Sequence, residues 1–253
     1  MSPAIGMGPV ARHDLSYTIL ATSGGIVAGQ RVPWEVGPLT EYAIELSGVT
    51  GRAPKVCFVA TAMGDKPFVI TNFYDAALQR GLAPSHLALF PMPNLERMRE
   101  HLLEQDVIWV GGGSVAGLLA MWELHGVGAM LREAWQAGVV LTGVSAGSIC
   151  WHVGGTTDSF GPDLQPVTNG LALIPFSNGV HYDSEEQRRP RFQQLIRDGV
   201  LPAGYATDDG VGLLYRNTEF VEALTETDGA AAYHVARDAA GDVVETVIDP
   251  RAL

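Results

Sequence analysis

The sequence predicts an α/β protein in three layers: a mostly parallel sheet, helices on both faces and an antiparallel C-terminal part. In the first half of the chain, short apolar segments typical of buried strands alternate with longer helical segments across short connections. Parallel strands linked by crossover helices produce this alternation. After Trp151 the segments become short and strand-like, which predicts the antiparallel part.

The expected elements follow from hydrophobic period and from turn residues. Strands of the parallel part are predicted over residues 17–21, 55–60, 86–90, 106–110 and 138–141. Helices are predicted over 38–46, 66–80, 94–104, 115–124 and 127–136, with Asn94 as the N-cap of the third. Further strands are predicted over 204–207, 212–215, 230–235 and 243–248. Because no linker interrupts the pattern, we expect one domain over residues 15–253, preceded by an N-terminal extension of residues 1–14.

Composition excludes several classes of protein. The 253 residues carry a net charge of −12, whereas nucleic-acid binding requires clustered Lys and Arg. There is no apolar run of membrane-spanning length and no signal peptide pattern, so we expect a cytoplasmic protein without membrane contact.

Cys57 and Cys150 lie in apolar strings and are expected to be buried thiols. No CxxC or HExxH pattern occurs, and we expect neither a metal nor a cofactor.

Small residues follow three of the predicted strands, at 22–25, 111–113 and 143–147. In parallel sheets the functional site lies beyond the carboxyl ends of the strands. The glycines at 111–113 lack the spacing and the lysine of a phosphate-binding loop. We therefore expect a glycine N–H of this turn to act as a hydrogen-bond donor in an oxyanion hole.

Residues 143–147 have the pattern G-x-S-x-G, with Ser145 at its centre. This pattern is typical of a sharp strand-to-helix turn that exposes a strained nucleophilic serine. The N–H of Ala146 would face the same space as the serine hydroxyl. The pattern also occurs by chance in glycine-rich turns, so other residues must support the interpretation of Ser145 as catalytic.

A serine nucleophile needs a base and an acid that orients the base. Of the seven histidines, His181 is the best candidate because it follows an apolar segment and is surrounded by small and polar residues. The alternative is a surface histidine in a polar loop. Asp158 lies between Ser145 and His181 in the sequence and is the first candidate acid; the other candidates are Asp163, Asp183, Glu185 and Glu186.

In this order, several segments resemble those of peptidase E, the aspartyl dipeptidase family of serine peptidases. They are Gly111-Gly112-Gly113-Ser114, Gly143-Val144-Ser145-Ala146-Gly147-Ser148, Asp158-Ser159 and His181-Tyr182-Asp183, with Thr22-Ser23-Gly24-Gly25 and Asp208-Asp209-Gly210 at the two ends. The resemblance covers roughly residues 17–235. It implies a fold similar to class I glutamine amidotransferases, with serine in place of their cysteine nucleophile.

The resemblance implies Ser145 as the nucleophile, His181 as the base and Asp158 as the orienting acid. It also implies Gly113 and Ala146 as the oxyanion donors. The acid varies among related enzymes, and cyanophycinase uses a glutamate.

The family prefers substrates with an amino-terminal aspartate, which implies a cation near the site. Arg188, Arg189 and Arg191 are candidates to bind that carboxylate, and Ser114, where the family often has Asn, is expected beside the substrate. The alternative for the arginines is the basic first turn of a solvated helix. We expect a small peptide as the partner, and a homodimer as the assembly to test. Two other functions stay open: a cyanophycinase-like hydrolase of another acidic peptide or amide, and a non-catalytic binding protein.

Overall fold

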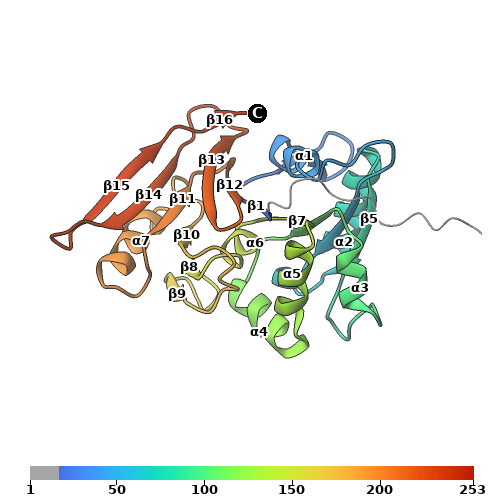
Figure 1. Cartoon of the computed structure of the whole chain (residues 1–253), viewed down its shortest axis with the longest axis horizontal. Helices are drawn as coiled ribbons and strands as arrows, with labels where there is room; N and C mark the ends of the chain where they lie inside the picture. Colours follow the sequence, from blue (N-terminus) through green and yellow to red (C-terminus); the bar gives the residue numbers. More distant parts are fainter. Residues whose placement is uncertain (1–16) are drawn as a thin grey trace, which may run out of the picture.

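The computed structural model describes residues 17–253, and the predicted extension of residues 1–14 lies outside them. Two sheets lie side by side, with the larger one between layers of helices (Figure 1). The α/β class, with a mostly parallel sheet and helices on both faces, is confirmed. The single-domain organisation of residues 15–253 stays a prediction. Within residues 17–253, every helix is too short or too polar to span a lipid bilayer.

The larger sheet has five parallel strands at its centre and on one side, and antiparallel strands on the other side. In spatial order its strands are β16 (Arg251–Ala252), β13 (Glu219–Thr225), β12 (Val211–Arg216), β1 (Thr18–Thr22), β7 (Val140–Val144), β6 (Val107–Val110), β4 (Lys55–Val59) and β5 (Ala83–Leu87). Strands β1 and β7 are neighbours, so the turns at their carboxyl ends meet at one edge of the sheet.

Alternate side chains of each central strand enter different cores, as the two-residue period of a strand requires. In β4, Val56 and Phe58 face one core, and Cys57 and Val59 face the other. The first core is covered by α2 (Pro67–Gln79), beside which lies α1 (Pro38–Glu45). The second is covered by α3 (Met98–Leu103), α4 (Val115–His125) and α5 (Val127–Gln136). Burial of both faces explains why these strands are almost continuously apolar.

The region after β4 differs from the prediction. Strand β5 pairs with β4 from Ala83 to Leu87, earlier than the predicted 86–90. The N–H groups of Leu89 and Phe90 instead donate to the carboxylate of Asp65. Helix α3 begins at Met98, so Asn94 is not its N-cap. The Asn94 side chain accepts a hydrogen bond from the Ala88 N–H and closes the loop after β5.

The C-terminal half builds a second sheet in addition to the antiparallel strands of the first. In spatial order its strands are β15 (Val243–Ile248), β14 (Ala232–Arg237), β11 (Gly204–Thr207), β10 (Ser177–Gly179), β8 (Gly154–Thr157) and β9 (Gln165–Val167). Helix α7 (Arg188–Arg197) packs on one face of this sheet through Phe192, Leu195 and Ile196. Figure 1 shows α7 beside β14, on the far side from the larger sheet.

Two further features connect the parts of the fold. A hairpin of β2 (Ile26–Ala28) and β3 (Trp34–Val36) follows β1 and packs against α2. Between the two sheets, the Tyr205 ring of β11 stacks on the Phe220 ring of β13 with centroids 4.7 Å apart. The chain passes from the second sheet to the first through the short turn between β11 and β12.

Candidate active site

Ser145 lies at the turn between β7 and the short helix α6 (Ala146–Ile149). Its backbone has φ 58° and ψ −112°, a conformation that costs a non-glycine residue free energy and marks strain at functional sites. The Ser145 N–H donates to the Thr22 carbonyl of β1 at 3.0 Å, which holds the turn against the neighbouring strand. The predicted strand–turn–helix setting of G-x-S-x-G is therefore present.

The two flanking glycines are required because backbone passes close to both. A Cβ on Gly143 would lie 2.5 Å from the Gly147 carbonyl oxygen. A Cβ on Gly147 would lie 2.2 Å from the carbonyl oxygen of Val110 in β6. Any side chain at either position would displace the serine turn.

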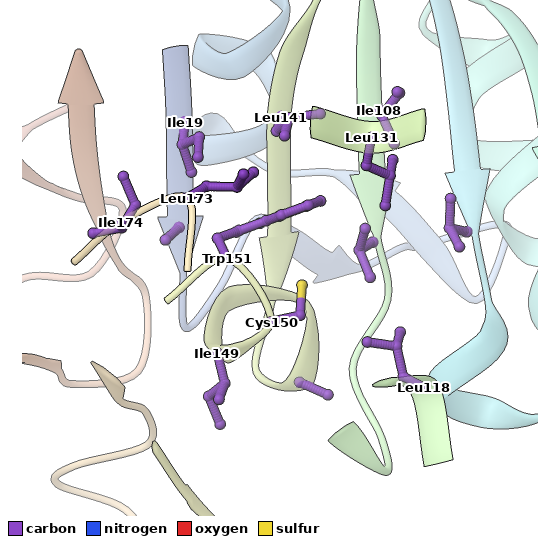
Figure 2. Close-up of a cluster of buried hydrophobic side chains, with 14 of the residues drawn as sticks. Ile19, Ile108, Leu118, Leu131, Leu141, Ile149, Cys150, Trp151, Leu173 and Ile174 are labelled. Carbon is purple, nitrogen blue, oxygen red and sulfur yellow. The ribbon is translucent and has the colours of Figure 1, made fainter. Parts of the chain in front are cut away.

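The turn rests on a large apolar core. Figure 2 shows Cys150 and Trp151, directly after α6, among buried side chains that include Ile19 and Leu141 from β1 and β7. Cys57 and Cys150 are both buried, as predicted, and burial raises the pKa of the Cys150 thiol well above its ordinary value. A buried neutral thiol is a poor nucleophile, which leaves Ser145 as the candidate nucleophile at this position.

His181 follows β10 and adopts the left-handed backbone conformation, with φ 53°. Its ring Nδ1 lies 2.5 Å from Oδ1 of Asp209, a residue of the turn between β11 and β12. The N–H of Asp209 in turn donates to the Asp183 carboxylate at 2.9 Å. The His181 side chain is 22% exposed, so the ring is partly open to solvent.

The end of β1 brings the serine turn and the histidine loop together. Thr22 accepts from the N–H of Ser145, and the next residue, Ser23, accepts from the N–H of His181 at 3.4 Å. Within residues 17–253, neither Ser145 Oγ nor His181 Nε2 has a hydrogen-bond partner. Catalytic hydrogen bonds of this kind often tighten only when substrate binds.

The expectation that Asp158 lies behind His181 is corrected by the structure. The Asp158 side chain is 63% exposed, and its carboxylate lies 4.0 Å from the Arg188 guanidinium. Asp158 follows β8 on the second sheet, whereas Asp209 occupies the Nδ1 side of the His181 ring. The fallback candidate Asp183 contacts the backbone of Asp209 rather than the histidine.

The glycine turn after β6 borders Ser145. A Cβ on Gly112 would lie 3.3 Å from Ser145 Cβ, a tight contact, and 3.9 Å from Ser145 Oγ, so the glycine turn lies directly against the serine. Gly113 has φ 122°, a conformation that favours glycine. Within residues 17–253, the N–H groups of Gly112 and Gly113 have no acceptor. Among the described residues, the N–H of Ala146 at the start of α6 likewise has no acceptor.

The predicted substrate-binding arginines have other partners. Arg188 is buried and donates to the Thr156 carbonyl and to Glu185, which fixes α7 to β8. Arg189 pairs with Glu245, and its guanidinium lies 4.8 Å above the Tyr233 ring.

The remaining two predicted binding residues also have structural roles. Arg191 donates to the Leu164 carbonyl at 3.1 Å and to the side chain of Gln194. The Ser114 hydroxyl caps α4 by accepting from the N–H of Gly117 at 3.1 Å. The expectation that the three arginines and Ser114 bind substrate is therefore not supported by these contacts.

Sequence reasoning missed Asp209, Gly112 and Ser23 as members of the site. Asp209 appeared only within the Asp208-Asp209-Gly210 segment of the family resemblance, and Gly112 only as part of a glycine run. The single usable signal for Asp209 was an acid in a short turn between two predicted strands.

A strained serine at a strand-to-helix turn, on the carboxyl edge of a parallel sheet and close to a histidine–carboxylate pair, defines an α/β serine hydrolase. Residues 20–223 match Peptidase family S51, and the chain belongs to this family. It is a serine-type peptidase.

Relatives and solved structures agree with this assignment. The chain is 42% identical over 182 residues to an uncharacterized peptidase, YgaJ, of Bacillus subtilis (strain 168), covering 72% of this chain and 78% of the relative. It is 32% identical over 170 residues to peptidase E of Shewanella denitrificans, covering 65% of this chain and 71% of the relative.

Two crystal structures share the fold at low identity. A peptidase from an acI-B1 Actinobacterium superposes with a TM-score of 0.62 at 16% identity, over 93% of this chain and 95% of that one. A putative peptidase E from Listeria monocytogenes EGD-e gives a TM-score of 0.57 at 19% identity, over 81% and 96% of the two chains.

Proposed function

We propose that this serine peptidase hydrolyses short peptides, with a preference for dipeptides that begin with aspartate, through Ser145, His181 and Asp209. The proposed catalytic mechanism rests on the 2.5 Å contact between His181 Nδ1 and Asp209. The end of β1 holds this histidine near the strained serine, because Ser23 and Thr22 accept from the N–H groups of His181 and Ser145. The aspartate preference rests on similarity to the relatives named peptidase E.

In the proposed mechanism, His181 Nδ1–H donates to Asp209, which leaves Nε2 unprotonated and able to accept a proton. Ser145 Oγ attacks the peptide carbonyl carbon while its proton passes to Nε2. The resulting imidazolium then gives that proton to the leaving amine as the peptide bond breaks. Water, deprotonated by the same nitrogen, hydrolyses the acyl-enzyme and frees Ser145.

The developing oxyanion would be stabilised by N–H groups of the two turns beside Ser145. We propose Ala146 and Gly113 as the donors, with Gly112 as a neighbouring N–H that is equally free. Loss of one such donor typically costs about 3 kcal/mol of transition-state stabilisation. The short distance between the Gly112 position and Ser145 supports this role, because it places the glycine turn beside the serine.

Hydrolysis of an aspartyl p-nitroanilide and of aspartyl dipeptides tests the proposal. We expect Ser145→Ala to lower kcat/KM by about 10⁴-fold or more. Cys150→Ala is the matched control, because it removes a buried thiol directly after α6 and should retain activity. Equal hydrolysis by wild type and Ser145→Ala would overturn the mechanism.

Substrate preference is tested separately with aminoacyl p-nitroanilides of Asp, Glu, Asn, Leu and Lys. A clear advantage for Asp supports the dipeptidase assignment. Labelling of Ser145 by a fluorophosphonate without hydrolysis of these substrates would instead favour another acidic peptide or amide, as in a cyanophycinase-like hydrolase. Absence of both labelling and hydrolysis would favour a binding protein. A cytoplasmic location and a homodimer stay predictions.

A further inference from the structure

Ser23 occupies the point where β1 meets the histidine loop and the turn that carries Asp209. The residue is 4% exposed. Its N–H donates to the Val211 carbonyl at 2.8 Å, and its carbonyl accepts from the Gly210 N–H at 3.0 Å. These two bonds hold the chain directly after Asp209 against the end of β1.

The Ser23 side chain also contacts the backbone of the proposed base, His181. Its Oγ accepts from the backbone N–H of His181 at 3.4 Å and lies 2.7 Å from Oγ1 of Thr207. Thr207 Oγ1 donates to the Gly179 carbonyl at 3.5 Å. One proton arrangement satisfies the whole chain: the His181 N–H donates to Ser23, Ser23 donates to Thr207, and Thr207 donates to Gly179.

His181 needs such a support because its backbone is in the left-handed region, with φ 53°. A residue with a Cβ populates this region only at a cost in free energy, so the surrounding structure must select it. The hydroxyl of Ser23 accepts the N–H that this conformation directs toward β1. Thr22, one residue earlier, accepts the N–H of Ser145 with its backbone carbonyl.

We infer that Ser23 is a positioning residue, whose hydroxyl sets the place of His181 relative to Ser145 during catalysis. This inference rests on the proposed triad. Ser23 acts through the backbone of His181 and needs no contact with substrate. Small displacements of a catalytic group lower the rate steeply, so loss of the hydroxyl should reduce kcat more than it raises KM.

The test compares Ser23→Ala with Ser177→Ala. Ser177 is a matched control because it is also buried and its hydroxyl also makes a hydrogen bond, which it donates to the Pro202 carbonyl at 2.7 Å. Both variants lose one buried hydroxyl. We expect Ser23→Ala to lower kcat on an aspartyl p-nitroanilide roughly tenfold with KM changed less than about twofold. Ser177→Ala should leave kcat within about twofold at a similar loss of Tm.

The rate of Ser145 labelling by a fluorophosphonate provides a readout that needs no knowledge of the substrate. We expect this rate to fall in Ser23→Ala by about the same factor as kcat, since both depend on proton removal by His181. If wild type is not labelled, the proposed triad fails. If wild type and Ser23→Ala are labelled equally fast, the triad stands and the role of Ser23 is overturned.

Two further variants keep the inference testable if Ser23→Ala folds poorly. Ser23→Thr retains the hydroxyl and should retain most of kcat. Thr207→Val keeps the shape of its side chain but removes the partner that orients the Ser23 hydroxyl, so kcat should fall by a smaller factor than in Ser23→Ala. Unchanged kcat and labelling in Thr207→Val, in a protein with wild-type Tm, would contradict the inference.

Discussion

Asp209 Oδ1 lies 2.5 Å from His181 Nδ1, and the two residues belong to different connections of the second sheet. His181 follows β10, while Asp209 lies in the turn through which the chain leaves β11 for β12 of the larger sheet. Ser145 follows β7 of the larger sheet. The proposed catalytic group therefore depends on how the two sheets meet, and the turn after β11 is one of the connections between them.

The first prediction separates the two candidate acids. Asp209→Asn should lower kcat by about 10²- to 10⁴-fold, because an amide no longer stabilises the imidazolium and permits the wrong tautomer. Asp158→Asn should change kcat less than about threefold, since its exposed carboxylate faces Arg188. Steady-state hydrolysis of an aspartyl p-nitroanilide by both variants measures the difference. The reverse ranking would restore Asp158 as the acid.

The second prediction concerns strain at the nucleophile. Ser145 has φ 58° and ψ −112°, which a glycine adopts more readily than a residue with a Cβ. Ser145→Gly should therefore be inactive and more stable than Ser145→Ala, by about 1 kcal/mol or more. Urea denaturation of both inactive variants isolates the backbone effect, because each lacks the hydroxyl. Equal stability would argue against a strained turn.

The third prediction tests the structural roles of two arginines. Arg188→Ala should lower the free energy of unfolding by about 2 kcal/mol, because the buried guanidinium donates to Thr156 and Glu185. Arg191→Gln, which removes a half-buried guanidinium that donates to the Leu164 carbonyl, should keep KM for an aspartyl substrate within about twofold. Denaturant titration and initial rates check the two outcomes. A large rise in KM for Arg191→Gln alone would return that residue to the substrate site.

The parallel part of the fold could be predicted because its strands are buried on both faces. Strands such as β4 and β6 are short continuous apolar runs, and this signal is local. Strand β10 gives no such signal, since it consists of Ser177, Asn178 and Gly179. Its buried polar groups are satisfied by partners far away in the sequence, for example the Ser148 hydroxyl that donates to the Asn178 side chain.

The same distinction explains which site residues could be found. Ser145 carries its own local pattern, and His181 follows an apolar segment, so both were identified from short stretches of sequence. Asp209 lies 28 residues after His181 in a turn whose position depends on the crossing between the two sheets. No local pattern distinguishes it from Asp158 or Asp183, because the choice depends on tertiary contacts.

The last prediction concerns the pH dependence of stability. His152 is fully buried below the serine turn, between the Ser148 carbonyl and the Tyr215 hydroxyl. Burial lowers its pKa from 6.5 to about 4, so the folded protein holds the ring neutral. Between these two pH values the unfolded chain binds a proton at His152 that the folded chain does not bind. Above pH 6.5 His152 is neutral in both states and does not lower the free energy of unfolding. As the pH falls from 6.5 toward 4, protonation of the unfolded chain lowers the free energy of unfolding progressively.

The loss attributable to His152 should reach about 3 kcal/mol at the acid end of that range. Urea denaturation of wild type and His152→Gln at several values between pH 7 and pH 4 measures it. His152→Gln should be less stable at pH 7, because its hydrogen bonds are altered, but should lose less stability on acidification. Other titrating groups contribute equally to both proteins, so the difference between the two slopes reports His152 alone. Parallel slopes would mean that the folded protein accommodates a protonated His152.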